Sequence, residues 1–221
     1  MRNSLRWSAA LIERERALIL LSCLSVIVFA FLAFEISSYK FIPEDIIILR
    51  TIHSYSTPVF DTIAVLLTKG GGGQLLIIFD LVVLGYLVSR RHFGSATFWT
   101  ASVGGASLCN YVAKHLFART RPDLWLSITP EFTFSFPSGH AMNSLAAAGA
   151  LLALTWQSKA RTKIAVALFF YVVLIGLSRM YLGVHYPSDV IAGWALSTVW
   201  IALMTIAFRN HMELNRYIAS R

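Results

Sequence analysis

The most regular feature of this chain is a succession of six long apolar segments separated by short polar stretches. The segments cover residues 17–34, 75–89, 93–113, 141–156, 164–177 and 190–208. A helix needs roughly 17–25 mostly apolar residues to cross the hydrocarbon core of a bilayer. Segment 75–89 is short and contains Asp80, whereas 141–156 and 164–177 can be lengthened by the polar motifs beside them. The pattern predicts an all-α fold, a six-span transmembrane helix bundle.

The ends of the chain frame this single bundle. Four arginines precede the first apolar segment, and that segment has 18 residues, longer than the roughly 7–15 of a signal-peptide core. We therefore expect it to be retained as the first span. The chain is predicted to consist of a cytoplasmic N-terminus at 1–16, a six-span domain at 17–208 and a cytoplasmic C-terminal tail at 209–221.

The longest connection covers residues 35–74, between the first two apolar segments. Its mixed apolar and polar pattern predicts short helices that lie at the membrane interface. The connection ends in four consecutive glycines, 70–73. This run lacks the Lys-Ser/Thr ending of a phosphate-binding P-loop, so we interpret it as a flexible turn before the second span.

The composition supports a membrane protein and argues against a nucleic-acid-binding one. Only 14% of the residues are charged and 57% are hydrophobic, whereas charged residues make up about a quarter of an ordinary soluble domain. The net charge is +8, but the basic residues lie mostly in the short connections between apolar segments. The expected partner is therefore the lipid bilayer, and no nucleic acid is expected.

The basic residues also predict an orientation. Twelve of the 19 Lys and Arg residues lie before span one, between spans two and three, between spans four and five, or after span six. An even number of spans places all of these on one side, which the positive-inside rule assigns to the cytoplasm. We expect a multi-pass protein of the cell membrane (inner or plasma membrane) with both termini in the cytoplasm.

Candidate chemistry begins with Lys114 and Arg121, which are followed by Pro122. They are seven positions apart, about two helical turns, so they face the same way if the helix continues to the proline. The planar fork of arginine suits bidentate contacts to phosphate, and lysine supplies a point charge. A pair of basic residues that merely snorkel to the membrane boundary is the alternative.

A second block, Pro-Ser-Gly-His at 137–140, directly precedes an apolar segment. Ser138 suits the N-cap of the following helix, and Gly139 lets the backbone approach a ligand closely. Free N–H groups at a helix start bind anions, and His140 would point at such an anion from the first turn. The alternative is a capped helix start with no ligand.

The third block contains Arg179, His185 and Asp189. Pro187 suits the first turn of the last helix, so Asp189 lies one turn from His185 and can accept its N–H. A carboxylate that fixes the tautomer leaves the other imidazole nitrogen free as a nucleophile. Arg179, at the end of a span, would be costly without an anionic partner. A structural His–Asp cap is the alternative.

Taken in order, the three blocks resemble the signature of the type-2 phosphatidic acid phosphatase superfamily, membrane-bound branch. The resemblance covers the chain after residue 17. It implies that His185 attacks phosphorus and forms a phosphohistidine, that Asp189 orients His185, and that His140 protonates the leaving oxygen and then helps to activate water. It further implies that the phosphate oxygens are held by Lys114, Arg121, Ser138, Gly139 and Arg179.

All three blocks fall in connections predicted to face outward, so we expect the active site at the outer (periplasmic or extracellular) face. Three cations can neutralise a phosphate there, and no carboxylate-rich metal spacing is present. We therefore predict a lipid phosphatase that needs no metal and no other cofactor. The oligomeric state stays open.

The blocks recognise phosphate alone, so several substrates remain. The resemblance favours hydrolysis of undecaprenyl diphosphate to undecaprenyl phosphate. Phosphatidylglycerophosphate, phosphatidate and lipid A phosphates are alternatives, as is a lipid phosphotransferase with the same residues.

Two rival functions are less favoured by the sequence. Vanadium haloperoxidases share the signature but are soluble, which six spans argue against. A lipid-phosphate transporter is disfavoured because the candidate polar groups gather at one face of the bundle, and Asp80 is the one charged residue near the middle of a predicted span. An acid within a span is a functional candidate by default, but Asp80 belongs to no block, so we expect it to make a structural hydrogen bond within the bundle.

Overall fold

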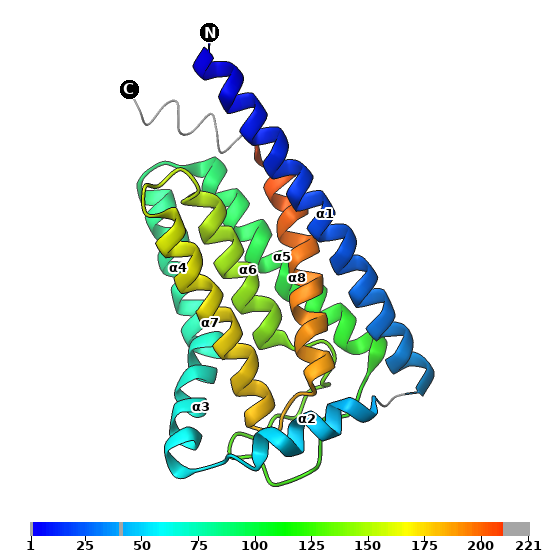
Figure 1. Cartoon of the computed structure of the whole chain (residues 1–221). Coiled ribbons are helices and arrows are strands. Elements are labelled where there is room, and N and C mark those ends of the chain that lie inside the picture. Colours follow the sequence, from blue (N-terminus) through cyan, green and yellow to red (C-terminus); the bar gives the residue numbers. More distant parts are fainter. Residues whose placement is uncertain (1, 40–41, 210–221) are drawn as a thin grey trace.

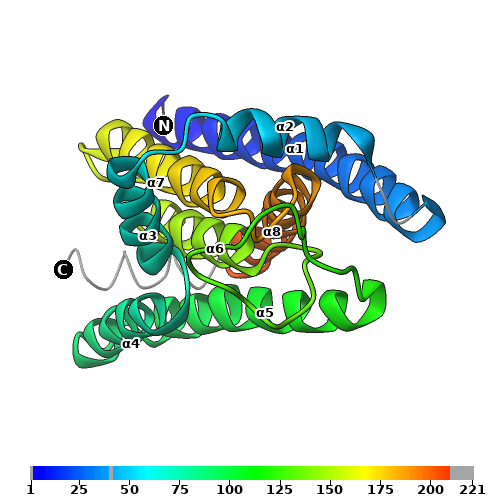
Figure 2. The same cartoon turned by 90° about the horizontal axis from the view of Figure 1, so that it is seen from below.

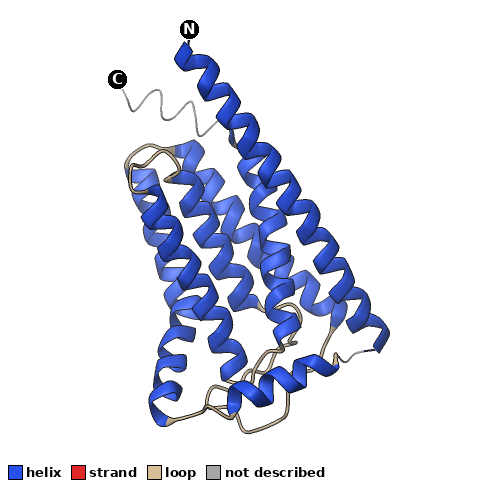
Figure 3. Ribbon diagram, in the orientation of Figure 1, coloured by secondary structure: helices blue, strands red, loops and turns tan. Residues whose placement is uncertain are grey.

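The computed structural model describes residues 2–39 and 42–209, and all regular structure in this part of the chain is helical (Figure 3). The helices are α1 (Arg2–Tyr39), α2 (Pro43–His53), α3 (Pro58–Gly71), α4 (Gly73–Ser89), α5 (Phe93–Phe117), α6 (Gly139–Leu154), α7 (Arg161–Tyr181) and α8 (Pro187–Ala207). The predicted all-α class is confirmed. Each of the six apolar segments lies on one helix, respectively α1, α4, α5, α6, α7 and α8.

The centre of the bundle is α6, which packs against α5, α7 and α8 (Figure 2). Its buried positions include Ala146, Ala147, Ala150 and Ala153. Small side chains let neighbouring helix backbones approach closely, as is common in membrane helix bundles. The small side chains of α6 therefore suit its central position, where three other long helices pack around it.

The periphery of the bundle carries large apolar side chains that face outward. On α1, Leu20 is 71% exposed, and Ile27, Phe31 and Phe34 are each at least 60% exposed. Apolar surface of this extent marks contact with lipid or another apolar partner. The segments Glu15–Ser38, Arg161–Tyr181 and Pro187–Ala207 are long and apolar enough to cross a membrane. The structure therefore has three candidate spans.

A fourth candidate span is formed by α3 and α4 together, which meet at a 40° bend. In Figure 1 the two helices form one column along the side of the bundle. The predicted flexible turn at 70–73 is therefore wrong in part, because Gly70 and Gly71 belong to α3 and Gly73 begins α4. Of the predicted interfacial helices, α2 lies across the lower end of the bundle (Figure 1).

One other expectation differs from the structure, and two stay predictions. Helix α1 begins at Arg2, so the predicted N-terminal segment is helical from that residue, while the candidate span within α1 is Glu15–Ser38. The expected hydrogen bond of Asp80 is not formed by its Oδ1 atom, which is buried without a partner among the described residues. The predicted C-terminal tail, apart from Arg209, lies outside the described residues.

The loops that carry the three sequence blocks gather at the lower end of the bundle, opposite the start of α1 (Figure 1). One is the long connection 118–138, which follows α5. It starts at Ala118, whose left-handed φ of 45° stops the helix. Seen from below, this connection passes over the ends of α6 and α8 (Figure 2).

Candidate active site

The deepest element of the site is the pair His185 and Asp189 at the start of α8. His185 lies in the short turn between α7 and α8, and Asp189 is the third residue of α8. The Nδ1 atom of His185 is 3.4 Å from Oδ2 of Asp189, and the backbone N–H of Tyr186 donates to the same oxygen at 2.9 Å. The His185–Asp189 contact predicted from the i, i+4 spacing is therefore present, in a fully buried position.

The tautomer of His185 follows from its other neighbour. Its Nε2 atom is 3.1 Å from NH1 of Arg121. A guanidinium group only donates hydrogen bonds, so Nε2 must carry a lone pair. The imidazole proton then resides on Nδ1, facing Asp189. The arrangement leaves Nε2 as an unprotonated nitrogen directed at a cation, which is the state required of a nucleophile.

The second block meets this pair at the start of α6. Ser138 is the N-cap, as predicted, and its Oγ accepts from the backbone N–H of Ala141 at 3.5 Å. The N–H of Ser138 itself donates to the backbone carbonyl of Asp189 at 2.9 Å, which joins the starts of α6 and α8. A Cβ atom on Gly139 would lie 2.9 Å from Oδ1 of Asn110, so a neighbouring side chain packs closely against this backbone, and the approach of a ligand to Gly139 stays a prediction.

The two basic residues of the first block do not share one helix, so the condition under which their spacing would align them is not met. Helix α5 ends at Phe117, so Lys114 lies in its last turn and Arg121 lies in the connection beyond it. Two backbone carbonyls hold the side chain of Arg121 at the site. Its Nε donates to the carbonyl of Thr133 at 2.6 Å, and its NH1 donates to the carbonyl of Val184 at 2.7 Å. Lys114 donates to the carbonyl of Phe134. Tertiary contacts therefore place both cations at the site.

The third cation, Arg179, is 1% exposed in the last turn of α7. It donates through NH1 to Thr68 of α3 and through NH2 to the carboxylate of Glu131. Its Nε atom is buried with no hydrogen-bond partner among the described residues. A buried guanidinium is stable only with anionic or strongly accepting partners, so this position is built for negative charge.

Glu131 is a central member of the site that the motif analysis missed. Its carboxylate contacts Arg179 and lies 2.9 Å from NH2 of Arg121, and its Oε1 is 3.9 Å from Nδ1 of His140. Burial alone would raise the pKa of Glu131, but Arg179, His140 and Arg121 lower it to about 2. The carboxylate is thus an anion bound between two guanidinium groups and a histidine.

Three further residues were also missed from the sequence. Gly72 lies against His140, because a Cβ atom at Gly72 would be 2.4 Å from the imidazole ring. Arg119 and Asp45 are buried charges behind the site: Arg119 contacts Asp189, and Asp45 contacts Arg119. The glycine run was visible in the sequence, but nothing in it pointed to a histidine almost seventy positions away.

The structure therefore brings the three blocks together at one end of the bundle. Arg121 contacts His185, and Glu131 links Arg121, Arg179 and His140. Three cations, two histidines and a helix N-terminus converge there. This inventory suits the binding of a phosphate and the stabilisation of its charge during transfer.

Comparison with known families matches residues 95–213, more than half of the chain, to the model of the PAP2 superfamily. The chain belongs to the PAP2 superfamily. The matched region contains all three sequence blocks and every helix from α5 to α8, apart from the first two residues of α5. The resemblance inferred from the motifs is thus confirmed at the level of the family.

Individual PAP2 relatives have different names. The chain is 36% identical over 106 residues to phosphatidylglycerophosphatase B of Bacillus subtilis (strain 168). This alignment covers 46% of this chain and 52% of the relative. The chain is also 36% identical over 104 residues to undecaprenyl-diphosphatase of Sulfolobus acidocaldarius. That alignment covers 45% of this chain and 48% of the relative. The alignments span about half the length of these curated relatives.

Two solved structures share the fold. A transmembrane PAP2-type phosphatidylglycerolphosphate phosphatase from Bacillus subtilis has a TM-score of 0.77 and 24% identity, covering 86% of this chain and 96% of its own. LpxE of Aquifex aeolicus has a TM-score of 0.60 and 25% identity. The match covers 73% of this chain and 94% of LpxE. The agreement shows that this PAP2 chain has the fold of a transmembrane protein.

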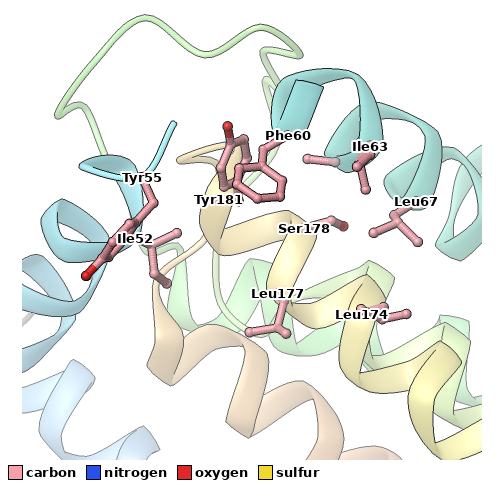
Figure 4. A pocket seen from close by; sticks show the side chains of 10 residues that line it. Ile52, Tyr55, Phe60, Ile63, Leu67, Leu174, Leu177, Ser178 and Tyr181 are labelled. Carbon is pink, nitrogen blue, oxygen red and sulfur yellow. The ribbon is translucent and has the colours of Figure 1, made fainter. Parts of the chain in front are cut away.

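An apolar cavity of about 300 Å³ lies between α2, α3 and α7 of this PAP2 chain. Its walls include Ile52, Phe60, Leu67 and Tyr181 (Figure 4). Ser178, which lines the cavity, directly precedes Arg179 in the last turn of α7, so the cavity lies at the same end of the bundle as the site. An apolar cavity at this end of the bundle fits an amphiphile that has a phosphate headgroup and a hydrocarbon chain.

The ionisation of His185 predicts a pH-dependent stability. Burial lowers the pKa of His185 well below its usual value, and Arg121, Arg179 and Lys114 lower it further. In the unfolded chain the pKa is ordinary, so between about pH 6.5 and the folded pKa only the unfolded state gains the proton. Folding stability should therefore decrease as the pH falls below about 6.5, by up to about 1.4 kcal/mol per pH unit.

The measurement is the thermal unfolding midpoint in detergent between pH 7.5 and 5.5. We expect His185→Gln to show a smaller decrease than the unmodified protein. His92→Gln, at the start of α5 and away from the site, should retain the full decrease. Equal slopes for all three proteins would show that His185 is not held neutral by the fold.

Proposed function

We propose that this protein is an integral membrane lipid phosphatase that acts through a phosphohistidine. The observation that carries the proposal is the position of His185, whose Nε2 lies 3.1 Å from the guanidinium of Arg121 while its Nδ1 faces Asp189. A neutral, oriented imidazole beside a cluster of cations is suited to attack on phosphorus. Phosphoryl transfer requires mainly such positioning and charge neutralisation.

Substrate binding is proposed to be an exchange of anions. The substrate phosphate would displace the carboxylate of Glu131 and bind the guanidinium groups of Arg121 and Arg179, which Glu131 contacts in this structure. Lys114 and the N–H groups at the Ser138–Gly139 helix start would hold the remaining oxygens. Because the three cations supply the positive charge that a metal ion would otherwise provide, the proposal includes catalysis without a divalent ion or other cofactor.

The reaction then has two steps. In the first, Nε2 of His185 forms a bond to phosphorus, the bond from phosphorus to the lipid oxygen breaks, and protonated His140 gives its proton to that oxygen. In the second, His140 takes a proton from water as the water attacks phosphorus. The P–Nε2 bond breaks and inorganic phosphate is released. Asp189 keeps the Nδ1 proton of His185 in place throughout.

The substrate is proposed to be a membrane lipid phosphate or diphosphate. The lipid-facing surface, the apolar cavity and the names of the relatives support this class. Undecaprenyl diphosphate, converted to undecaprenyl phosphate, is the first candidate, and phosphatidylglycerophosphate stands beside it because relatives of both names match at 36% identity. Phosphatidate and lipid A phosphates complete the set, since lipid A 1-phosphatase of Rhizobium etli also matches.

The protein is proposed to cross the inner or plasma membrane six times. In this arrangement the site lies on the outer face and both termini lie in the cytoplasm. The support is that α1, α4, α5, α6, α7 and α8 coincide with the apolar segments. The site also lies at the end of the bundle opposite the start of α1 (Figure 1). That separation agrees with twelve of the 19 Lys and Arg residues being predicted on the other side.

The test is phosphate release by detergent-purified protein with excess chelator present. The panel contains undecaprenyl diphosphate, phosphatidylglycerophosphate, phosphatidate, a lipid A phosphate and a short water-soluble alkyl phosphate. We expect release that persists in chelator and is faster with lipids than with the soluble phosphate. Activity lost in chelator and restored by a divalent ion would refute the metal-free mechanism.

Other outcomes separate the rival functions. Loss of the phosphoryl group from the donor lipid only after a second lipid is added, with the label found on that second lipid and not in inorganic phosphate, would identify a phosphotransferase. Movement of lipid phosphate across vesicles without any hydrolysis would identify a transporter. Either result would overturn the hydrolase proposal while leaving the family membership intact.

A further inference from the structure

Behind the proposed nucleophile lies a buried cluster of three charged side chains. NH1 of Arg119 donates to Oδ1 of Asp189 at 2.6 Å, and NH2 of Arg119 donates to Oδ2 of Asp45 at 2.9 Å. Arg119 is 5% exposed, Asp45 3% and Asp189 0%. The first residue comes from the connection after α5, the second from α2 and the third from α8. One guanidinium thus joins two carboxylates from distant parts of the chain.

The two oxygens of Asp189 have separate partners. Oδ2 faces Nδ1 of His185 and accepts from the backbone N–H of Tyr186, whereas Oδ1 accepts from Arg119. A carboxylate held at both oxygens cannot rotate, so the direction in which it accepts the His185 proton is fixed. Partners of this kind, one step removed from a functional histidine, set the orientation and tautomer of the ring.

Asp45 in turn holds Arg119 and the first turn of α8. Its Oδ1 accepts from the backbone N–H of Ser188 at 2.9 Å, and its Oδ2 accepts from Oγ of Ser188 as well as from Arg119. Ser188 Oγ also accepts from NH1 of Arg119 at 2.7 Å. Asp45 is therefore the link between α2, which lies across this end of the bundle, and the residue directly before Asp189.

The chemistry of this cluster requires an arginine. Two NH groups of one planar fork reach two carboxylates at once, which a lysine ammonium cannot reproduce with the same geometry. The guanidinium carbon also lies 4.0 Å from the ring centre of Tyr186, in a cation–π contact. Without Arg119, Asp45 and Asp189 would be two buried anions close together, an arrangement with a large desolvation penalty.

We propose that Arg119, anchored by Asp45 of α2, is a positioning residue that holds Asp189 and through it His185 for attack. Arg119 does not belong to the phosphate-binding set, since its contacts are directed to the far side of Asp189. The seating of α2 at this end of the bundle is thereby coupled to the geometry of the nucleophile. The inference rests on the proposed hydrolase function.

The first experiment measures kcat and KM for the best lipid of the panel in Arg119→Gln. We expect kcat to fall about 10- to 100-fold, the range seen when a partner that orients a functional histidine is removed, and KM to change by less than about twofold because the phosphate contacts stay. Arg119→Lys should recover little. Arg50→Gln removes an exposed arginine from α2 and serves as the matched control.

The second experiment tests whether Arg119 acts through Asp189. If it does, the double variant Arg119→Gln with Asp189→Asn should be no slower than Asp189→Asn alone. Losses that multiply, or a raised KM with unchanged kcat in Arg119→Gln, would refute the proposal. A purely structural role would lower the yield of folded protein and leave kcat per folded molecule unchanged.

Asp45→Asn keeps the proposal testable if Arg119→Gln does not fold. The amide retains an acceptor for the Ser188 N–H but removes the charge that holds Arg119, so we expect a smaller fall in kcat, again with KM unchanged. Glu44→Gln, at the exposed neighbouring position, is its control. Full activity in Asp45→Asn would refute the anchoring role of α2.

The same assays distinguish failure of this inference from failure of the proposed function. An active unmodified protein with an Asp189→Asn variant that is strongly slowed but still measurable upholds the hydrolase mechanism. Unchanged kcat in Arg119→Gln would then refute the positioning role alone. No hydrolysis by the unmodified protein on any lipid would refute the function on which the inference rests.

Discussion

Replacement of His185 by alanine is expected to reduce phosphate release by at least about 10⁴-fold, because loss of a nucleophile removes the covalent route entirely. The unmodified protein should also yield a phosphorylated form when it is quenched early in turnover with labelled substrate. The label should be stable in base and labile in acid, as phosphohistidine is. His185→Ala should trap no label although its phosphate-binding cations are intact.

The control for this variant is His92→Ala, at the opposite end of α5 from Lys114, which should retain activity and labelling. Retention of most activity by folded His185→Ala would contradict the covalent mechanism and favour direct attack by water. Label recovered on another residue would place the nucleophile elsewhere in the site. Midpoints of thermal unfolding, measured for both variants, separate loss of chemistry from loss of structure.

Replacement of His140 by glutamine is expected to have the second largest effect, about 10² to 10⁴-fold on lipid substrates, as for removal of a general acid–base group. The physical reason is that an alkoxide or a lipid phosphate is a poor leaving group without a proton. An aryl phosphate with an acidic phenol leaves unaided. The variant should therefore lose much less activity on an activated aryl phosphate than on the lipid.

The measurement is the ratio of kcat values on the two substrates in unmodified protein, His140→Gln and His185→Ala. Glutamine is chosen because its planar side chain can occupy the space next to Gly72, where the imidazole now lies. His185→Ala should lose both activities, since attack is needed for either substrate. An equal loss on both substrates in His140→Gln would show that His140 binds phosphate and does not protonate the leaving group.

The predicted elements that agree with the structure all depend on short stretches of chain. Apolar periodicity and length located the helices, and capping preferences located Ser138 at the start of α6 and Pro187 at the start of α8. The His185–Asp189 contact follows from an i, i+4 spacing across a helix start. These features are decided by neighbours a few residues apart, so they can be inferred without knowledge of the fold.

The expectations that differed concern segments whose conformation depends on distant contacts. The seven-residue spacing of Lys114 and Arg121 would align them only on a continuous helix, but α5 ends at Phe117 and Arg121 is held by carbonyls of Thr133 and Val184. The glycine run 70–73 predicted a flexible turn, yet α3 ends and α4 begins within it, and the two helices meet at a 40° bend. Local composition alone does not contain these contacts.

The helical class, the apolar segments, the family and the chemical inventory of two histidines, three cations and a carboxylate can therefore all be inferred from the amino-acid sequence. The position of Glu131 between Arg121 and Arg179, and the link that Arg119 makes between Asp45 and Asp189, emerge from the folded bundle alone. These partners are far apart along the chain. Arg119 is 74 positions from Asp45 and 70 from Asp189, so their pairing arises from the packing of helices, which no local pattern encodes.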